Sequence, residues 1–394
     1  MFKTISSIER HIDYVLLLPV FFLLLTGFFS VFIATSHDYP DRVGIVMIQQ
    51  LAWTAIGLLM ALVVMLFSKS FLWKVSPLLY VLGLGLMVLP LIYFDAGLVS
   101  STGAKNWVTL GGATLFQPSE FMKIAYILIL AVVTVWYQEQ FPQVSIARDL
   151  KLLGLYGLLT VPVFILLGLQ KDLGTSLVFL AILSGIILLS GVSWRLILPV
   201  VGGFAAGIAG FLWVFTQSWG KDFFFNLGMD TYQINRISAW LDPFAYAEGI
   251  SYQQTQSMIA IGSGGLTGKG FNVIDLNIPV RESDMIFTVI AENFGFIGSS
   301  LLLILYLLLI YRMLKITLVS NNRFYVYISS GFIMMILFHI FENIGAAIGL
   351  LPLTGIPLPF ISQGGSSLVT NLIGVGLVLS MSFQQSLEQE QKSS

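Results

Sequence analysis

Ten long apolar runs decide what this 394-residue chain can fold into. A bilayer core about 30 Å thick requires roughly 20 apolar residues in helical conformation. Runs of about that length cover residues 13–35, 44–67, 75–94, 119–137, 152–169, 173–191, 196–215, 285–311, 324–350 and 365–383. We therefore predict an all-α integral membrane protein with about ten transmembrane helices, which form a single polytopic membrane domain over residues 1–394.

Composition agrees with lipid as the main solvent and excludes several classes of function. Hydrophobic residues make up 57% of the chain and charged residues 10%, whereas a soluble domain is roughly 25% charged. The formal net charge of −1 gives no sign of a nucleic-acid partner. The absence of Cys excludes disulfides and thiolate metal sites, and with three His residues we assign no metal ligands. No ATPase, dinucleotide-binding or zinc-protease motif occurs.

Lys and Arg in the short loops predict the orientation, because cytoplasmic loops carry an excess of both. A cytoplasmic N-terminus places eleven cations on the cytoplasmic side: Lys3, Arg10, Lys69, Lys74, Arg148, Lys151, Arg195, Arg312, Lys315, Arg323 and Lys392. The short loops of the other side then hold Arg42, Lys105 and Lys171. Both termini are therefore expected in the cytoplasm.

The segment over residues 216–283 is expected to be a large extracytoplasmic loop between helices 7 and 8. Loops above about 15 residues in a compact unit are usually functional or disordered, and the many aromatic residues of this one argue against disorder. The spacing over Tyr252–Ile261 predicts a short amphipathic helix at the interface, with its aromatic side towards lipid. Five glycines follow within residues 262–270, which allows close backbone approach to a ligand or simply tight turning.

Asp284 ends this polar segment and precedes an apolar helix. The helix dipole favours an ionised carboxylate at a helix N-terminus, and such a group can accept a proton from a substrate hydroxyl. The structural alternative is a helix-capping or first-turn acid, a position where Asp is common.

Glu120 and Lys123 lie three residues apart, so they face each other on one predicted helix. Each charge within a span costs about 2.5–3.5 kcal/mol, so both are expected to face the protein interior or each other. A structural ion pair and a substrate contact are equally open. Asp172, before Thr175, is likewise open between helix capping and a substrate role.

Two further polar sets have structural and functional interpretations. His339, Glu342 and Asn343 form a stripe on the ninth predicted helix, which suits either an ion pathway or interhelical hydrogen bonding. The outward-facing cations suit a phosphate or pyrophosphate ligand, or a solvated surface. They are Lys105, Arg236, Lys269 and Arg281, with Lys171 nearby.

Several strings together resemble the SEDS (shape, elongation, division, sporulation) family of bacterial peptidoglycan polymerases. The strings are GAKNWVTLGGATLFQPSEFMKIA (103–125), QKDLGTSL (170–177), RISAWLDPF (236–244), GISYQQTQSMIAIGSGGLTGKG (249–270), PVRESDMIFTVIAENFGFIG (279–298) and LPLTGIPLPFISQGGSS (351–367). They occur in family order, and TGIPLPFIS resembles the elongation members more than the division members.

The resemblance implies a ten-helix protein of the bacterial cytoplasmic membrane that polymerises lipid II, the undecaprenyl-pyrophosphate-linked disaccharide-pentapeptide. It also implies a class B penicillin-binding protein as partner, which supplies transpeptidase activity. The family's essential Asp matches Asp284, and its PSE-x-x-K string matches Glu120 and Lys123. This chain departs from the family at Lys171, which replaces the Pro of PDLGT, and at residues 281–283, where many members have a His-Thr pair.

The expected reaction is an inverting glycosyl transfer, because an α-linked pyrophosphate leaves and a β-1,4 linkage forms. Asp284 is the expected general base, and a divalent cation (Mg or Mn) is a possible assistant at the pyrophosphate. The expected substrate contacts are Lys105, Glu120, Lys123, Asp172, Arg236, Gln256 and Lys269. Two alternatives are a lipid II flippase, with intramembrane charges as the relay, and a non-catalytic scaffold for the penicillin-binding protein.

Overall fold

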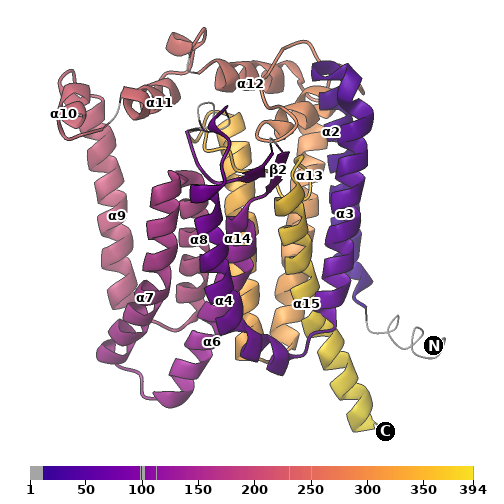
Figure 1. The fold of residues 1–394 in the computed structure, drawn as a ribbon, viewed down its shortest axis with the longest axis vertical. Coiled ribbons are helices and arrows are strands. Elements are labelled where there is room, and N and C mark those ends of the chain that lie inside the picture. The colour runs from indigo at the N-terminus through magenta and orange to yellow at the C-terminus, as the bar shows by residue number, and fades with distance from the viewer. Residues whose placement is uncertain are drawn as a thin grey trace.

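The fold is a bundle of long helices (Figure 1). A computed structural model describes residues 12–97, 99, 103–111, 113–229, 231–249 and 251–393. Nine helices within these ranges are long and apolar enough to cross a membrane. They are α2 (Tyr14–Asp38), α3 (Val43–Met65), α4 (Lys69–Ile92), α6 (Pro118–Gln140), α7 (Ile146–Gln170), α9 (Trp194–Phe215), α13 (Ile286–Val319), α14 (Arg323–Ala347) and α15 (Gly365–Ser393).

The sixth predicted span is the shorter apolar helix α8 (Leu173–Leu189), which has 17 residues. Each of the ten predicted runs therefore corresponds to one helix, and the predicted all-α membrane fold is confirmed. Lys3 and Arg10, which entered the prediction of orientation, lie outside the described residues.

The shorter elements lie at one end of the bundle, opposite the C-terminal end of α15 (Figure 1). Between α4 and α6, β1 (Val108–Leu110) and β2 (Ala113–Phe116) form an antiparallel hairpin. The long segment between α9 and α13 contains α10 (Gly220–Asn226), α11 (Thr231–Leu241), the 3₁₀ turn η2 (Phe244–Tyr246) and α12 (Tyr252–Ser263). A second 3₁₀ turn, η1 (Pro40–Arg42), joins α2 to α3.

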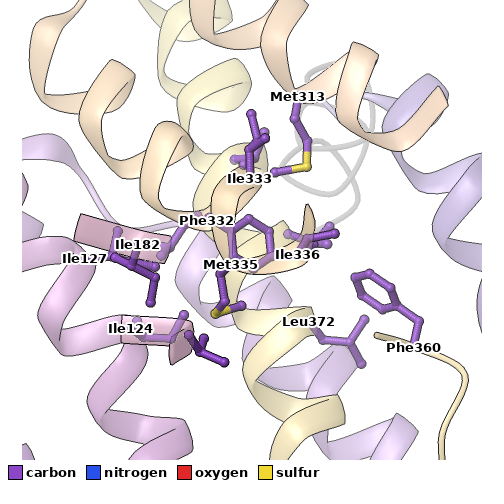
Figure 2. Packing of buried hydrophobic residues seen from close by; sticks show 14 of the residues in the cluster. Ile124, Ile127, Ile182, Met313, Phe332, Ile333, Met335, Ile336, Phe360 and Leu372 are labelled. Carbon is purple, nitrogen blue, oxygen red and sulfur yellow. The ribbon is translucent and has the colours of Figure 1, made fainter. Parts of the chain in front are cut away.

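The apolar core is centred on α6 and α14, which are buried along most of their length. Figure 2 shows Ile124 and Ile127 of α6 facing Ile182 of α8 and Phe332 of α14. By contrast, α9 stands at the edge of the bundle (Figure 1), and Phe215 at its end is the buried residue that it contributes. Both of these buried helices carry charged residues within their spans, Glu120 and Lys123 on α6 and Glu342 on α14.

Helix α13 is broken at Gly295, whose φ of 63° and ψ of −158° are not helical. Two N–H groups of the glycine-rich segment 262–270 donate to the carbonyls of residues 292 and 293, at 2.9 and 3.1 Å. Two N–H groups just after the break donate back to this segment, also at 2.9 and 3.1 Å. At Gly268, a Cβ atom would collide with the carbonyl of Asn293. Gly264 and Gly268 therefore serve close packing against α13 near its break. Positive φ angles at Gly265, Gly268 and Gly270 agree with the expected tight turning, and approach to a ligand stays a prediction.

Helix α12 confirms the helix predicted over Tyr252–Ile261. Tyr252 is exposed, as expected for the outer face, but the inner face is polar. Gln254 donates to the carbonyl of Ala346 at 2.9 Å, and Ser257 donates to that of Ala347 at 2.7 Å. The last carbonyls of a helix have no hydrogen-bond donor within the helix. These two side chains therefore supply donors to the carbonyls at the C-terminal end of α14.

The connection between α14 and α15 enters the bundle instead of passing over it. We call residues 348–364 the α14–α15 segment; it is irregular, and residues 358–362 are buried. Backbone without regular structure is tolerated at membrane depth only where protein surrounds it. Side chains satisfy its carbonyls, as when Tyr306 donates to Pro359 at 2.6 Å and Gln254 donates to Leu351 at 2.8 Å.

Candidate active site

Asp284 lies between the long segment and α13. Its carboxylate does not cap α13, because Met285 occupies the N-cap position and no side chain caps this helix. The hydroxyl of Ser283 donates to Asp284 Oδ1 at 3.0 Å, and the residue is half-buried. The structural alternative for this residue, a capping acid, is therefore not the arrangement observed.

The α14–α15 segment lies directly beside this carboxylate. Gly355 has a φ of +78°, and a Cβ atom on it would lie 3.3 Å from Asp284 Oδ2. A side chain at position 355 would thus press on the carboxylate in addition to straining the backbone. Gly355 leaves room around one oxygen of Asp284.

Burial raises the pKa of Asp284, and the hydrogen bond from Ser283 opposes this rise. Burial also raises the pKa of the neighbouring Glu282, with a further contribution from the charge of Asp284. A carboxylate with a raised pKa holds an abstracted proton more firmly, so it is a better general base near neutral pH.

Asp172 caps α8 and organises the polypeptide before it. Its Oδ1 accepts from the backbone N–H of Thr175 at 3.0 Å, and its Oδ2 accepts from the hydroxyl of Thr175 at 2.9 Å. Asn106 also donates to Oδ2, at 2.8 Å. Asp172 therefore caps α8, as one of the two interpretations of the sequence predicted. Asn106 was not among the candidate site residues predicted from the sequence.

The start of α8 and Asp284 lie on either side of Thr354 and Gly355. A Cβ atom on Gly174 would lie 3.0 Å from the carbonyl of Thr354. Since Gly355 follows directly and borders Asp284, the α14–α15 segment brings together strings that lie more than a hundred residues apart. The sequence signal for this was the string 351–367, in which no single residue stood out.

The backbones of two lysines lie close together at the same end of α8. The backbone N–H of Lys105 donates to the carbonyl of Gln170 at 2.7 Å, which brings Lys105 next to Lys171. The Lys105 ammonium lies 4.3 Å from the centre of the Phe94 ring. Lys171 is exposed and has a left-handed φ of 58° after the end of α7.

The other expected substrate contacts are more dispersed. Arg236 is exposed on α11, and Gln256 is half-buried on α12. Lys269 donates to Asp275 at 2.7 Å and to the buried Glu292 at 2.8 Å. Because these two carboxylates neutralise Lys269, a phosphate contact from it stays a prediction.

Arg281 is fully buried, although the sequence placed it among the outward-facing cations. Its Nε lies 3.6 Å from Oδ2 of Asp38 at the end of α2, and its Nη2 donates to the carbonyl of Leu276. Arg281 therefore anchors the chain before Asp284 to α2.

Glu120 and Lys123 form a buried ion pair at 2.8 Å. The Lys123 ammonium also lies 3.4 Å from Nε2 of His339 on α14. Glu342, one turn further along α14, accepts a hydrogen bond from the hydroxyl of Thr354. These contacts join α6 to α14, and α14 in turn to the segment beside Asp284. The Glu120–Lys123 pair therefore belongs to the contacts that hold the elements around Asp284 together. A contact between this pair and the substrate stays a prediction.

Within the described ranges, no three His, Asp or Glu side chains gather as a group that could hold a metal ion. The expected assistance from a divalent cation therefore stays a prediction.

Comparison with known proteins defines the class. The family model FTSW_RODA_SPOVE, described as "Cell cycle protein", matches residues 12–387. The match spans nearly the whole chain, so the chain belongs to this family. The resemblance inferred from the strings of the sequence is confirmed.

Individual relatives narrow the comparison. The peptidoglycan glycosyltransferase MrdB of Escherichia coli (strain K12) is 35% identical over 383 residues, which are 94% of this chain and 93% of the relative. The stage V sporulation protein E of Bacillus subtilis (strain 168) is 33% identical over 380 residues, covering 94% of this chain and 96% of the relative.

Two solved structures are similar along nearly the full length. One, from work titled "Structural coordination of polymerization and crosslinking by a peptidoglycan synthase complex", has a TM-score of 0.75 at 30% identity and covers 95% of this chain and 98% of its own. The rod shape determining protein RodA of Thermus thermophilus has a TM-score of 0.65 at 29% identity and covers 94% and 96%.

Proposed function

We propose that this chain polymerises lipid II into glycan strands during cell elongation, with Asp284 as the general base of an inverting glycosyl transfer. The enzyme class is the one carried by the name of its relative MrdB, peptidoglycan glycosyltransferase, and the prediction of this class is confirmed. Lipid II is the activated disaccharide that such a reaction consumes.

The position of Asp284 is the observation that carries the proposal. Its carboxylate accepts a hydrogen bond from its neighbour Ser283, is bordered by a glycine, and does not cap a helix. Asp284 directly precedes α13, at the end of the long segment, and this segment lies at one end of the bundle (Figure 1). A carboxylate that the fold uses for no evident structural purpose, with a pKa raised by burial, is suited to exchange a proton with a substrate.

In the proposed step, the Asp284 carboxylate takes the proton of the acceptor sugar's 4-hydroxyl as that oxygen attacks the donor's anomeric carbon. The new C1–O4 bond forms on the face opposite the leaving group, and the bond from C1 to the pyrophosphate oxygen breaks. The electron pair of that bond leaves with the undecaprenyl pyrophosphate. General-base assistance of this kind typically contributes about 10²–10⁴-fold to the rate.

Lys105 and Lys171 are suited to stabilise the departing pyrophosphate. Their backbones lie close together near the start of α8, where the helix N-terminus itself is already occupied by the carboxylate of Asp172. Positive charge for the phosphates must then come from side chains. Arg236 and Gln256, on the long segment, are proposed to contact the sugar-phosphate part of the substrate from above.

The proposed location is the bacterial cytoplasmic membrane, with both termini in the cytoplasm and the long segment outside. The end of α15 lies at the opposite end of the bundle from that segment, which supports this orientation (Figure 1). The prenyl chain of the substrate remains in lipid, since each CH₂ transferred to water would cost about 0.8 kcal/mol.

A class B penicillin-binding protein is the proposed partner. The similar structure comes from a complex that couples polymerization to crosslinking. Glycosyl transfer at Asp284 joins sugars and forms no peptide bond, so crosslinking requires a second activity. A transpeptidase supplies it.

The test is polymerisation of labelled lipid II by the purified full-length protein, followed by gel separation of the glycan products. The wild type is expected to produce glycan ladders, and Asp284→Asn is expected to lose about 10²-fold or more of the rate. Glu248→Gln is the matched control, because Glu248 is an exposed acid of the same long segment. It is expected to behave as wild type.

Three outcomes separate the alternatives. Ladders from Asp284→Asn at the wild-type rate would refute the role of this carboxylate. Label that crosses into vesicles without ladders would indicate a flippase. Neither ladders nor transport would indicate a scaffold.

A further inference from the structure

Three consecutive backbone carbonyls at the proposed base are each held by a hydrogen bond from outside their own segment. The N–H of Gln363 donates to the carbonyl of Glu282 at 2.8 Å. The hydroxyl of Ser362 donates to that of Ser283 at 2.7 Å. The side-chain amide of Asn343 donates to that of Asp284 at 2.8 Å.

Asn343 differs from the other two donors because it links two segments at once. Its Nδ2 also donates to the carbonyl of Ile356 at 2.9 Å. The residue is 2% exposed. Both amide hydrogens are thus used by carbonyls that flank the active site, one at Asp284 and one next to Gly355.

The second link matters because Gly355 is the wall beside the Asp284 carboxylate. A single buried amide, carried on the regular helix α14, therefore links the backbone of the base to the segment that borders its carboxylate. Side chains on regular helices hold such geometry better than side chains on loops.

We infer that Asn343 is a positioning residue for glycosyl transfer, which holds the backbone of Asp284 and the segment around Gly355 in one fixed arrangement. This inference rests on the proposed role of Asp284 as the base. Asn343 touches backbone and no reacting atom, so it acts through Asp284.

The expected effect of its loss is on turnover more than on substrate binding. A misplacement of about 1 Å at the reacting groups can cost roughly 10²-fold in rate. We expect Asn343→Leu, which keeps the approximate volume and removes both donors, to lower kcat by about 10- to 100-fold. KM is expected to stay within about 2-fold, because Asn343 lies behind the carboxylate.

Gln254 offers a matched control. It too is a buried amide, 5% exposed, whose Nε2 donates to two backbone carbonyls, those of Ala346 and Leu351, at 2.9 and 2.8 Å. These bonds join α12 to the end of α14 and to the first part of the α14–α15 segment, and they involve neither Asp284 nor Ile356. Gln254→Met should therefore lower the melting temperature to a similar extent as Asn343→Leu, while kcat stays near that of the wild type.

The experiment measures kcat, KM and melting temperature for both variants of the full-length protein with labelled lipid II. A wild-type kcat in Asn343→Leu would overturn the inference, and so would an equal loss of kcat in Gln254→Met. If Asn343→Leu does not fold, Ser362→Ala tests the same arrangement by a smaller change, with an expected loss of kcat of about 3- to 10-fold. Asp284→Asn in the same assay separates the two proposals: if it is active, the base assignment fails, and if it is inactive beside a fully active Asn343→Leu, only the positioning role fails.

Discussion

The buried pair of Glu120 and Lys123 allows a test that separates a structural role from a substrate role. The two charges are 2.8 Å apart, and their side chains are 7% and 3% exposed. Lys123 lies in addition 3.4 Å from His339. The perturbation is Lys123→Met alone, compared with the double replacement Glu120→Met and Lys123→Met.

The magnitudes follow from the burial of the pair. Removing one partner of a buried ion pair costs about 3–5 kcal/mol, because the remaining charge is left uncompensated. That is a large part of a total stability of about 5–15 kcal/mol. Replacing both partners by apolar residues of similar volume is often neutral. The lost hydrogen bond to His339 adds about 1 kcal/mol.

The assay combines thermal unfolding in detergent with polymerisation of labelled lipid II. We expect the single variant to melt well below the wild type and the double variant to melt close to it. A double variant that is stable and active assigns the pair to structure. A double variant that is stable but makes no glycan indicates that the Glu120–Lys123 pair contacts the substrate.

The reasoning itself is refuted by one result. If the double variant is as unstable as Lys123→Met, the loss does not come from an uncompensated charge. The pair would then be net stabilising in its own right, contrary to the estimate for buried pairs.

Three further predictions concern backbone and protonation. Gly295→Ala is expected to lower the free energy of unfolding by at least about 1–2 kcal/mol, because its φ is positive and a Cβ atom would meet the segment 262–270. In the matched control Gly207→Ala, the Cβ atom meets open space on α9, so stability should be unchanged or higher by up to about 1 kcal/mol. Because the pKa of Asp284 is raised, its contribution to stability is present below the pKa of the unfolded chain and lost as pH rises through the pKa of the folded state. Asp284→Asn should thus melt at or above the wild type at neutral pH, and the difference should vanish in acid. The polymerisation rate of the wild type should fall on acidification at a higher pH than for an ordinary aspartate, and a profile flat down to the ordinary aspartate range would contradict the assignment of the base.

The helices and the depth of the charged residues could be predicted from the sequence. A spanning helix is a local property, since it needs only a sufficient length of apolar residues, and each of the ten runs corresponds to a helix. The ion pair of Glu120 and Lys123 could be foreseen for the same reason, because neighbours three residues apart on a helix face each other. Asp284 was found at the boundary between a polar segment and an apolar run.

Other features depend on contacts between distant parts of the chain, which leave no local pattern. The run of glycines in 262–270 left close approach to a ligand and tight turning open. The hydrogen bonds that this segment exchanges with the break at Gly295 appear only in the folded structure. Arg281 was expected among the cations of the extracytoplasmic side, but its burial depends on Asp38, which lies more than two hundred residues away in the chain.

The apolar runs alone determined that this chain is a helical membrane protein, and the residues within and between them supplied its candidate polar groups. Tertiary structure decided which of these groups remain available. Lys269 is paired with Glu292, while Asp284 is held by its backbone and forms no ion pair among the residues that the structure describes. The physical reason is that the ionisation and reactivity of a side chain depend on partners a few ångströms away in space, and helix packing chooses those partners without regard to their distance in sequence.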